Sequence, residues 1–302
     1  MNNMKHFILA ASLAAMAAPI AQAEQKPNIL FIAIDDMNDW TGFLGGHPQA
    51  ITPNMDKLAK KGVNFTNAHC PAPGCSPSRN ALLFGIEPFH SGLYAFYDEG
   101  TPEKVAKTHV SIPLFLRQNG YETFGSGKVF HGQFHTPEDW NDYRDPIKKK
   151  LNFDLTEGYQ QENNLEKRFG PLTTPVEDHP DYQFTSYGVE ILKKKHDQPF
   201  FLAIGLTKPH IPCICPKEFF DLYPKDIEPP PINPNDLDDI PAVGVALALA
   251  NSDKKIKADN AWNTIRRSYL ACISWTDHNV GLLLDTLAAS PYADNCCRAV
   301  NF

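Results

Sequence analysis

An uninterrupted apolar segment near the start of the chain, Asn28 to Ile34 (NILFIAI), ends directly at two aspartates, Asp35 and Asp36. An isoleucine-rich segment without polar alternation is typical of a strand that is buried on both faces, as in a parallel sheet. A second segment of this kind, Phe200 to Leu206 (FFLAIGL), occurs much later in the chain. The two segments predict central strands of a largely parallel sheet whose faces are covered by helices.

Helical patterns separate and follow these strands, so the sequence predicts an α/β fold. The segments with apolar residues at helical spacing are 53–62, Ile112–Gln118, Phe184–Lys195 and Trp262–Leu287. In the first of them we expect Thr52 to be the N-cap, Pro53 to occupy the first helical position and Gly62 to end the helix.

Three further segments have weaker patterns. Tyr121 to Ser126 is expected to be another strand, followed by Gly127-Lys128. Residues 132–180 are polar and irregular, which predicts surface loops. Residues 212–241 contain many prolines and predict a long ordered loop.

The first residues have the pattern of a secretory signal peptide. Lys5 gives a positive start, Phe7 to Ile20 is apolar, and Ala21-Gln22-Ala23 fits the small-x-small cleavage rule. The apolar part is too short to span a bilayer, and no later apolar segment reaches the roughly twenty residues that a membrane helix needs. We therefore expect a signal peptide at 1–23 and a single catalytic domain at 24–302, exported to the periplasm or the extracellular space.

Composition limits the classes of function. The formal net charge is −7, which argues against a nucleic-acid partner, because phosphate contacts need a basic surface. Hydrophobic residues make up 42% of the chain, enough for a folded core. Seven cysteines are too few for a disulfide scaffold, although an oxidising compartment allows some of them to pair.

The most specific motif is Cys75-Ser76-Pro77-Ser78-Arg79, which precedes a short apolar stretch. A cysteine at a helix start lies at the positive end of the helix dipole. Taken alone, Cys75 also fits a structural or disulfide-linked cysteine. The pair Asp35-Asp36 is equally open: it suits a hard divalent cation such as Ca²⁺ or Mg²⁺, and it also suits a solvated turn.

Taken together, these motifs resemble the type I, formylglycine-dependent sulfatases, in particular their iduronate-2-sulfatase-like branch. The resemblance covers residues 26–295. The matching segments are Asp35-Asp36, Cys75 to Arg79, Gly127 to His131 (GKVFH), Phe200 to Ile211 (FFLAIGLTKPHI) and Tyr269 to Leu284. The resemblance implies an alkaline-phosphatase-like fold, with a mixed, largely parallel sheet flanked by helices. It also implies a sulfuric ester hydrolase that removes sulfate from a sulfated carbohydrate.

In that family a maturation enzyme oxidises the signature cysteine to Cα-formylglycine, and the resemblance implies the same conversion of Cys75. The hydrated aldehyde is a diol: one hydroxyl attacks sulfur, and the other, after losing its proton, expels sulfate. The resemblance further implies that Asp35, Asp36 and the modified Cys75 bind a divalent metal, expected to be Ca²⁺, which lowers the pKa of the diol.

The same resemblance implies roles for four other residues. Arg79 would hold the formylglycine and balance negative charge near it. Lys128 would bind the sulfate oxygens, and His131 would contact the diol. His210, in Lys-Pro-His, would protonate the leaving oxygen.

The sequence departs from the family near its end. The family has two further metal ligands, an Asp followed by Asn or His, on a strand after the long helix, and a lysine later still. Asp277-His278 falls inside that helix, where neighbours point about 100° apart, and Asp294-Asn295 falls in the turn after it, so we assign neither pair to metal. Residues 296–302 do not have a strand pattern, but their codons read one base later can encode valine and leucine. We therefore expect a C-terminally truncated, frameshifted chain with weak metal binding and impaired activity.

Two alternatives remain open at the level of sequence. One is a phosphoester or phosphonate hydrolase of the same superfamily, because related enzymes also use formylglycine. The other is a non-catalytic sulfatase-like remnant that keeps the fold and has lost the chemistry. Neither the particular sulfate ester nor the oligomeric state can be read from the sequence.

Overall fold

The computed structural model describes residues 26–94, 101–131, 136–154, 156–160, 168–248 and 251–301, and the expected signal peptide lies outside this range. Its centre is a five-stranded sheet with the order β3-β2-β6-β1-β8. The strands are β1 (Asn28–Asp35), β2 (Glu122–Gly127), β3 (Asp142–Arg144), β6 (Phe200–Pro209) and β8 (Cys296–Asn301). Every pair of neighbours in this sheet is parallel.

The two apolar segments form the neighbouring strands β1 and β6 in the middle of the sheet, as the sequence predicts. Ile29 to Ile34 pair in register with Phe201 to Leu206. Leu30, Leu202 and Ile204 are fully or almost fully buried, which agrees with strands covered on both faces.

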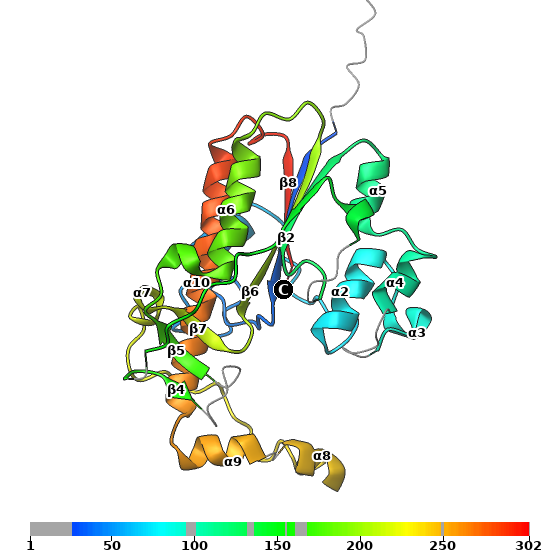
Figure 1. Cartoon of the computed structure of the whole chain (residues 1–302). Coiled ribbons are helices and arrows are strands. Elements are labelled where there is room, and N and C mark those ends of the chain that lie inside the picture. Colours follow the sequence, from blue (N-terminus) through cyan, green and yellow to red (C-terminus); the bar gives the residue numbers. More distant parts are fainter. Residues whose placement is uncertain are drawn as a thin grey trace, which may run out of the picture.

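Helices cover both faces of this sheet (Figure 1). On one face lie α6 (Pro180–Lys193) and α10 (Trp262–Ala288), and on the other lie α2 (Cys75–Phe84) and α5 (Ile112–Gln118). The larger apolar core lies under α6 and α10, and a smaller one, which includes Leu83, Phe130 and Phe201, lies on the α2 side. The three-layer arrangement confirms the predicted α/β fold.

A second, three-stranded sheet lies beside the N-terminal part of α10 (Figure 1). It has the order β4-β5-β7 and consists of β4 (Tyr159–Gln160), β5 (Arg168–Leu172) and β7 (Cys213–Pro216). The expectation of loops over 132–180 was therefore wrong for β3, β4 and β5. These strands are short, and β3 and β5 pair with β2 and β7, which lie outside this segment, so their own residues carry little alternation.

The remaining helices are short. They are α1 (Pro53–Ala59), α3 (Pro88–Ser91), α4 (Thr101–Ala106), α7 (Lys217–Phe220), α8 (Ala242–Ala248), α9 (Asn251–Ala258) and the 3₁₀ helices Pro137–Asp139 and Val176–Asp178. The proline-rich segment 212–241 thus begins with β7 and α7 and continues as an irregular loop.

The start of α1 differs from the sequence expectation. Pro53 occupies the first position, but the side chain of Thr52 does not cap the helix; its hydroxyl donates to Asp56 instead, at 2.9 Å. The carboxylate of Asp277, on α10, accepts hydrogen bonds from the backbone N–H of Asn54 at 3.1 Å and of Met55 at 2.8 Å. The helix ends at Ala59, three residues before Gly62. Asp277 therefore has a structural role between two helices.

The last described residues form a strand, contrary to the sequence expectation. β8 pairs in parallel with the free edge of β1, with Ile29 opposite Cys297 and Ile32 opposite Val300. Most side chains of β8 are exposed, because this strand is at the edge of the sheet. Backbone pairing with β1, rather than an apolar pattern, holds it in place.

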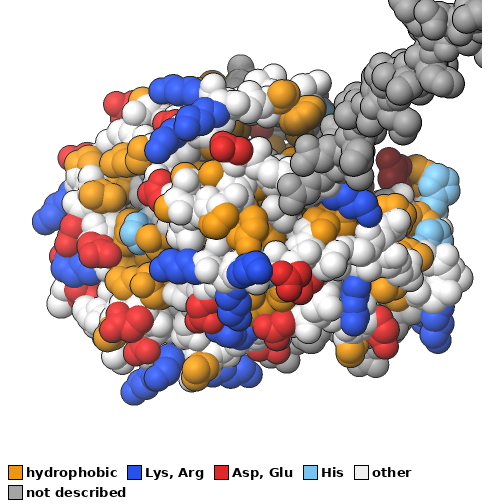
Figure 2. Space-filling view, turned by 90° about the horizontal axis from the view of Figure 1, so that it is seen from above, with side chains coloured by type: hydrophobic (Ala, Val, Ile, Leu, Met, Phe, Trp, Pro, Cys, Tyr) orange, Lys and Arg blue, Asp and Glu red, His pale blue; other side chains and the backbone are white. Residues whose placement is uncertain are grey.

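The surface carries charges of both signs. Figure 2 shows a face on which lysine and arginine side chains lie among aspartate, glutamate and hydrophobic side chains. Among the helices of the described residues, none has the length and apolar character that crossing a membrane requires.

Candidate active site

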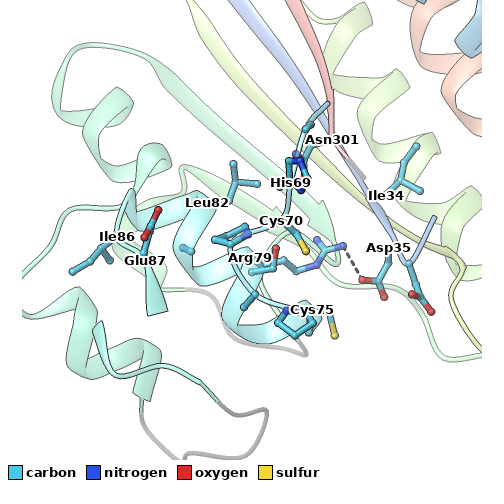
Figure 3. Close-up of a pocket in the computed structure, with 18 of the residues that line it drawn as sticks. Ile34, Asp35, His69, Cys70, Cys75, Arg79, Leu82, Ile86, Glu87 and Asn301 are labelled. Carbon is cyan, nitrogen blue, oxygen red and sulfur yellow. Dashed lines mark hydrogen bonds and ion pairs between the residues drawn. The ribbon is translucent and has the colours of Figure 1, made fainter. Parts of the chain in front are cut away.

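A pocket of about 770 Å³ lies at the carboxyl end of β1, beside the start of α2. In open α/β sheets this edge is the usual place for ligands. Figure 3 shows side chains from β1, from the loop before α2 and from α2 itself around the pocket. Asp35, Asp36, Cys75, Arg79 and His210 line it.

The end of β1 is shaped to present two consecutive carboxylates. The pairing of β1 with β6 is irregular between Ile34 and Asp35, and Asp36 adopts a positive φ of 59°. The Tyr269 hydroxyl, from α10, donates to the carbonyl oxygen of Asp36 at 2.9 Å and accepts from the backbone N–H of Asn38 at 2.9 Å. The long helix therefore holds the turn that follows Asp35.

Asp35 is 2% exposed and is bound by two cations. Arg79 Nη2 lies 3.0 Å from Asp35 Oδ1, and Lys128 Nζ lies 2.5 Å from Asp35 Oδ2. Burial by itself would raise the pKa of Asp35, but the charges of Arg79 and Lys128 and the Lys128 hydrogen bond hold that pKa below its usual value. Asp35 is therefore an anion at neutral pH.

The start of α2 places Cys75 and Arg79 on the same side of the helix. Gly74 is the N-cap in extended conformation and Cys75 is the first helical residue, so Arg79 follows one turn later. The Arg79 guanidinium is buried and also donates to the carbonyl oxygens of Lys128 and Val129, the latter at 3.1 Å. Figure 3 shows Arg79 reaching from α2 to Asp35. This side chain therefore connects α2, β1 and the segment after β2.

Lys128 is directed by a glycine turn at the end of β2. Gly127 has φ 80°, and a Cβ there would come within 2.1 Å of the Gly205 carbonyl oxygen, so only glycine fits. The Lys128 ammonium lies 3.6 Å from Cys75 Sγ as well as on Asp35. His131 follows in the same segment, and burial together with the nearby Lys128 charge lowers its pKa. This segment therefore adds a cation and a neutral imidazole to the site.

His210 approaches from the segment between β6 and β7. Its Nε2 lies 4.0 Å from Asp35 Oδ2, and its Nδ1 lies 2.6 Å from the carbonyl oxygen of Ile211. A carbonyl oxygen only accepts hydrogen bonds, so Nδ1 carries a proton and Nε2 is the nitrogen on the side of Asp35.

A set of buried contacts fixes the backbone beside His210. Asp181, at the start of α6, is 2% exposed and accepts from the backbone N–H groups of Thr207 and Lys208, each at 2.9 Å. Lys208 Nζ donates to the carbonyl oxygens of His210 at 3.0 Å and Pro212 at 2.7 Å. Lys208 therefore stabilises the loop that carries His210.

The structure thus brings the predicted residues to one place. Lys128 is not among the lining residues but contacts two of them, Asp35 and Cys75, and His131 interacts electrostatically with Lys128 and Asp35. Asn301 lines the pocket from the end of β8 and was not predicted as a site residue. Its signal was positional: a segment after the long helix is where an α/β chain places its next strand.

The donors for a divalent cation are present in part. Asp35 and Asp36 supply carboxylate oxygens, the ligand type that Ca²⁺ prefers, and Cys75 lines the same pocket. Both Asp35 oxygens are engaged by Arg79 and Lys128. Among the residues that the structure describes, no group of three or more His, Cys, Asp or Glu side chains is arranged to hold a metal ion. The oxygen chemistry fits a hard cation, with fewer side-chain ligands than such a cation takes.

Comparisons with known proteins add independent findings. The family model described as Sulfatase matches residues 27–297. A curated sulfatase from Formosa agariphila is 36% identical over 292 residues, covering 89% of this chain and 57% of that protein. The iduronate 2-sulfatase of Homo sapiens is 32% identical over 289 residues, covering 86% of this chain and 51% of that protein. The chain therefore spans about half the length of the curated relatives it matches.

A solved structure extends the comparison to the fold. The phosphonate monoester hydrolase of Agrobacterium radiobacter superposes with a TM-score of 0.66 at 16% identity, covering 91% of this chain and 62% of that chain. At this identity the likeness establishes a shared fold alone. It confirms the expected alkaline-phosphatase-like architecture, with its largely parallel sheet between layers of helices.

Proposed function

The chain belongs to the sulfatase family, and from this premise we propose that its pocket hydrolyses the sulfate ester of a sulfated carbohydrate, with Cys75 converted to formylglycine. The observation that carries the proposal is the position of Cys75. It begins α2, lies 3.6 Å from the Lys128 ammonium, and opens onto the pocket that Asp35 and His210 line. A nucleophile for an anionic ester needs such a cation close by.

The hydrated aldehyde of formylglycine would supply a hydroxyl that attacks sulfur and a second hydroxyl whose deprotonation releases sulfate. The chain's own residues would prepare this chemistry. Lys128, beside Cys75, would bind sulfate oxygens and offset the charge that builds up on them. Arg79 would hold the start of α2 against Asp35 and the segment after β2, and so keep residue 75 in position.

His210 is suited to donate a proton to the leaving oxygen. Its Nδ1 donates to the Ile211 carbonyl oxygen, so Nε2, on the side of Asp35, is the nitrogen that would donate to the leaving oxygen. The Asp35 carboxylate lies 4.0 Å from this nitrogen, at the pocket where the leaving oxygen would be protonated. His131, neutral at pH 7 because its pKa is lowered, is suited to accept a hydrogen bond from the diol.

Asp35, Asp36 and the modified residue 75 would hold a divalent cation, most simply Ca²⁺, together with ligands beyond these three. When bound, the cation would lower the pKa of the diol and screen the sulfate charge. Dialysis against a chelator is expected to abolish turnover, and added Ca²⁺ to restore it. If chelated protein keeps full activity, the cation has no place in the proposal.

We propose the substrate class by analogy with the relatives, and the compartment from the first residues of the sequence. Iduronate 2-sulfatase is named for a sulfated sugar, and we propose a sulfated carbohydrate for this chain as well. The expected signal peptide at 1–23 supports export to the periplasm or the extracellular space. An enzyme that generates formylglycine is the implied partner in maturation.

The proposal is tested by mass spectrometry of the Cys75 peptide after co-expression with an active formylglycine-generating enzyme. Conversion replaces the thiol with an aldehyde, a loss of about 18 mass units, and makes the peptide reactive toward carbonyl reagents. We expect this product, and turnover of an aryl sulfate that falls by at least ~10³-fold in Cys75→Ala.

Other outcomes would overturn the proposal in distinguishable ways. Conversion of Cys75 with faster turnover of an aryl phosphate or phosphonate than of the sulfate would favour the phosphoester or phosphonate hydrolase. A thiol that persists at Cys75, while the maturation enzyme converts a known substrate in the same cells, would favour the non-catalytic remnant.

A further inference from the structure

Three buried cysteines outside the pocket have no part in the proposed chemistry. Cys213 and Cys215 lie on β7, two residues apart, and Cys272 lies on α10. β7 packs against α10, as Figure 1 shows, and all three cysteines belong to the main apolar core. Cys215 and Cys272 are both 0% exposed. β7 and α10, which are far apart in the sequence, therefore pack together, and both carry cysteine thiols in the core between them.

The contacts of these thiols select one pair. Cys215 and Cys272 are both fully buried in the same core, and the neighbouring Cys215 thiol adds to the effect of burial in raising the pKa of Cys272. Cys213 has a different partner, because its Sγ donates to the Pro209 carbonyl oxygen at 3.5 Å. A disulfide needs two cysteines that the fold brings side by side, and the packing of β7 on α10 places thiols of both elements in one core.

We propose that Cys215 and Cys272 form a disulfide in the exported protein and thereby fasten β7 to α10. This rests on the export included in the proposed function. A bond forms between the two Sγ atoms, and the two thiols lose two protons and two electrons. The oxidant is a protein disulfide of the oxidising compartment, which is reduced to its dithiol through a mixed disulfide.

The bond has to form during folding. The attacking species in thiol–disulfide exchange is the thiolate, and burial raises the pKa of Cys272 well above its ordinary value. The folded core also excludes an oxidant protein from both sulfurs. Oxidation therefore takes place before α10 closes over β7, and a chain that folds in a reducing compartment keeps both thiols.

The disulfide would act on the segment that carries His210. The N-terminal end of this segment is already held by α10, because the Thr276 hydroxyl donates to the Lys208 carbonyl oxygen at 2.9 Å. Cys215 lies at the C-terminal end of the same segment, on β7. With the bond formed, the same helix would hold both ends of the His210 segment.

The test compares two preparations of the whole chain. One carries a foreign secretion signal in place of residues 1–23, so that export does not depend on the chain's own signal, and the other is made in a reducing cytosol. Free thiols are alkylated in denaturant without reduction, and the protein is digested with trypsin. We expect a cross-link between peptides 196–217 and 268–298 in the exported protein, and alkylated cysteines in the cytosolic one.

Single variants assign the bond, because peptide 196–217 also contains Cys213, and peptide 268–298 also contains Cys296 and Cys297. The cross-link should persist in Cys213→Ala, the matched control, and vanish in Cys215→Ala and in Cys272→Ala. Reduction should lower the Tm of the exported wild type and of Cys213→Ala by roughly 5–10 °C and leave the Tm of the other two variants unchanged.

The proposal is overturned if Cys215 and Cys272 of the exported protein are both alkylated. It is also overturned if the cross-link survives in Cys215→Ala and disappears in Cys213→Ala, which would assign the bond to the other β7 cysteine. If the chain is not exported by its own signal, the proposed localisation fails. The disulfide test is unaffected, because it uses a foreign secretion signal.

Discussion

Two aspartates with the same burial differ in what surrounds them. Asp35, at the pocket end of β1, and Asp277, between α1 and α10, are each 2% exposed. Asp35 is bound by the Arg79 and Lys128 cations, and its pKa is lowered. Asp277 is bound by backbone N–H groups and the Asn54 amide, and burial raises its pKa to about 6.

The difference distinguishes a carboxylate of the candidate active site from one that connects two helices. A buried carboxylate with two cations keeps its charge and gathers charged groups at a pocket, which is what an anionic substrate or a metal needs. A buried carboxylate with neutral donors is harder to ionise, because no cation offsets the loss of hydration. Its contribution is the set of hydrogen bonds that connects two helices. The partners of a buried acid, rather than its burial, indicate its role.

The largest expected effect comes from removing the Arg79 cation. Arg79→Gln leaves a buried carboxylate with one cation and frees the carbonyl oxygens of Lys128 and Val129. We expect a loss of about 3–5 kcal/mol in unfolding free energy, and a fall in kcat/KM of at least ~10³-fold. Urea unfolding and aryl sulfate turnover measure the two effects. Arg79→Lys, which keeps the charge but not the fork of donors, should recover part of the stability only. If Arg79→Gln is as stable as the wild type, the Arg79–Asp35 ion pair does not stabilise the fold.

Lys128→Met comes next, because Lys128 is less buried than Arg79 and its stem can be replaced by a side chain of similar length. The variant removes one cation from Asp35 and the cation beside Cys75. We expect a fall in kcat/KM of about 10²–10³-fold with a smaller loss of stability, about 1–3 kcal/mol. Lys208→Met is a matched control, since that ammonium donates to backbone carbonyl oxygens of the His210 loop instead. Equal losses of turnover in the two variants would contradict a direct role for Lys128.

The comparison also explains how far the sequence leads. The apolar segments of β1 and β6 predict the centre of the sheet, because strands buried on both faces carry their signal in their own residues. Asp35 could be predicted as a site residue because it follows such a strand. β8 was missed because its residues are mostly exposed and its order comes from pairing with β1.

The role of Asp277 could not be predicted for a similar reason. Its partners, Asn54 and Met55, lie more than two hundred residues earlier in the chain, and only the packing of α1 on α10 brings them together. Asp181 is another such case: its bonds to the backbone of Thr207 and Lys208 form only once α6 lies beside β6. Tertiary hydrogen bonds of this kind leave no local pattern.

Asp181→Asn would extend the comparison to a third buried carboxylate, with an intermediate effect. Asp181 Oδ1 accepts from the N–H and the hydroxyl of Thr207, and Oδ2 accepts from Lys208 N–H. An amide has one acceptor oxygen, so at least one donor loses its partner, at about 1–3 kcal/mol. Because the His210 backbone is next to this contact, we expect kcat to fall about 10-fold with KM nearly unchanged. An altered KM with normal kcat would place Asp181 in substrate binding instead of in the positioning of His210.

The smallest effect, and the most direct test of the difference between the two acids, is the pH dependence of Asp277→Asn. The pKa of Asp277 is about 6 in the folded chain, against about 3.9 when unfolded, so the native state binds more protons between these values. Wild-type stability therefore falls as pH rises through this window, by about 1–3 kcal/mol, and the fall is complete above pH 6. The asparagine variant cannot ionise, but it gives up one of the two oxygens that accept from Asn54 and Met55. It should be less stable than wild type near pH 4, and the gap should shrink or reverse by pH 7. Urea unfolding of both proteins at each pH measures this gap. A constant gap would mean that folding leaves the pKa of Asp277 unchanged, and a gap that widens would mean that Asp277, like Asp35, is stabilised as an anion.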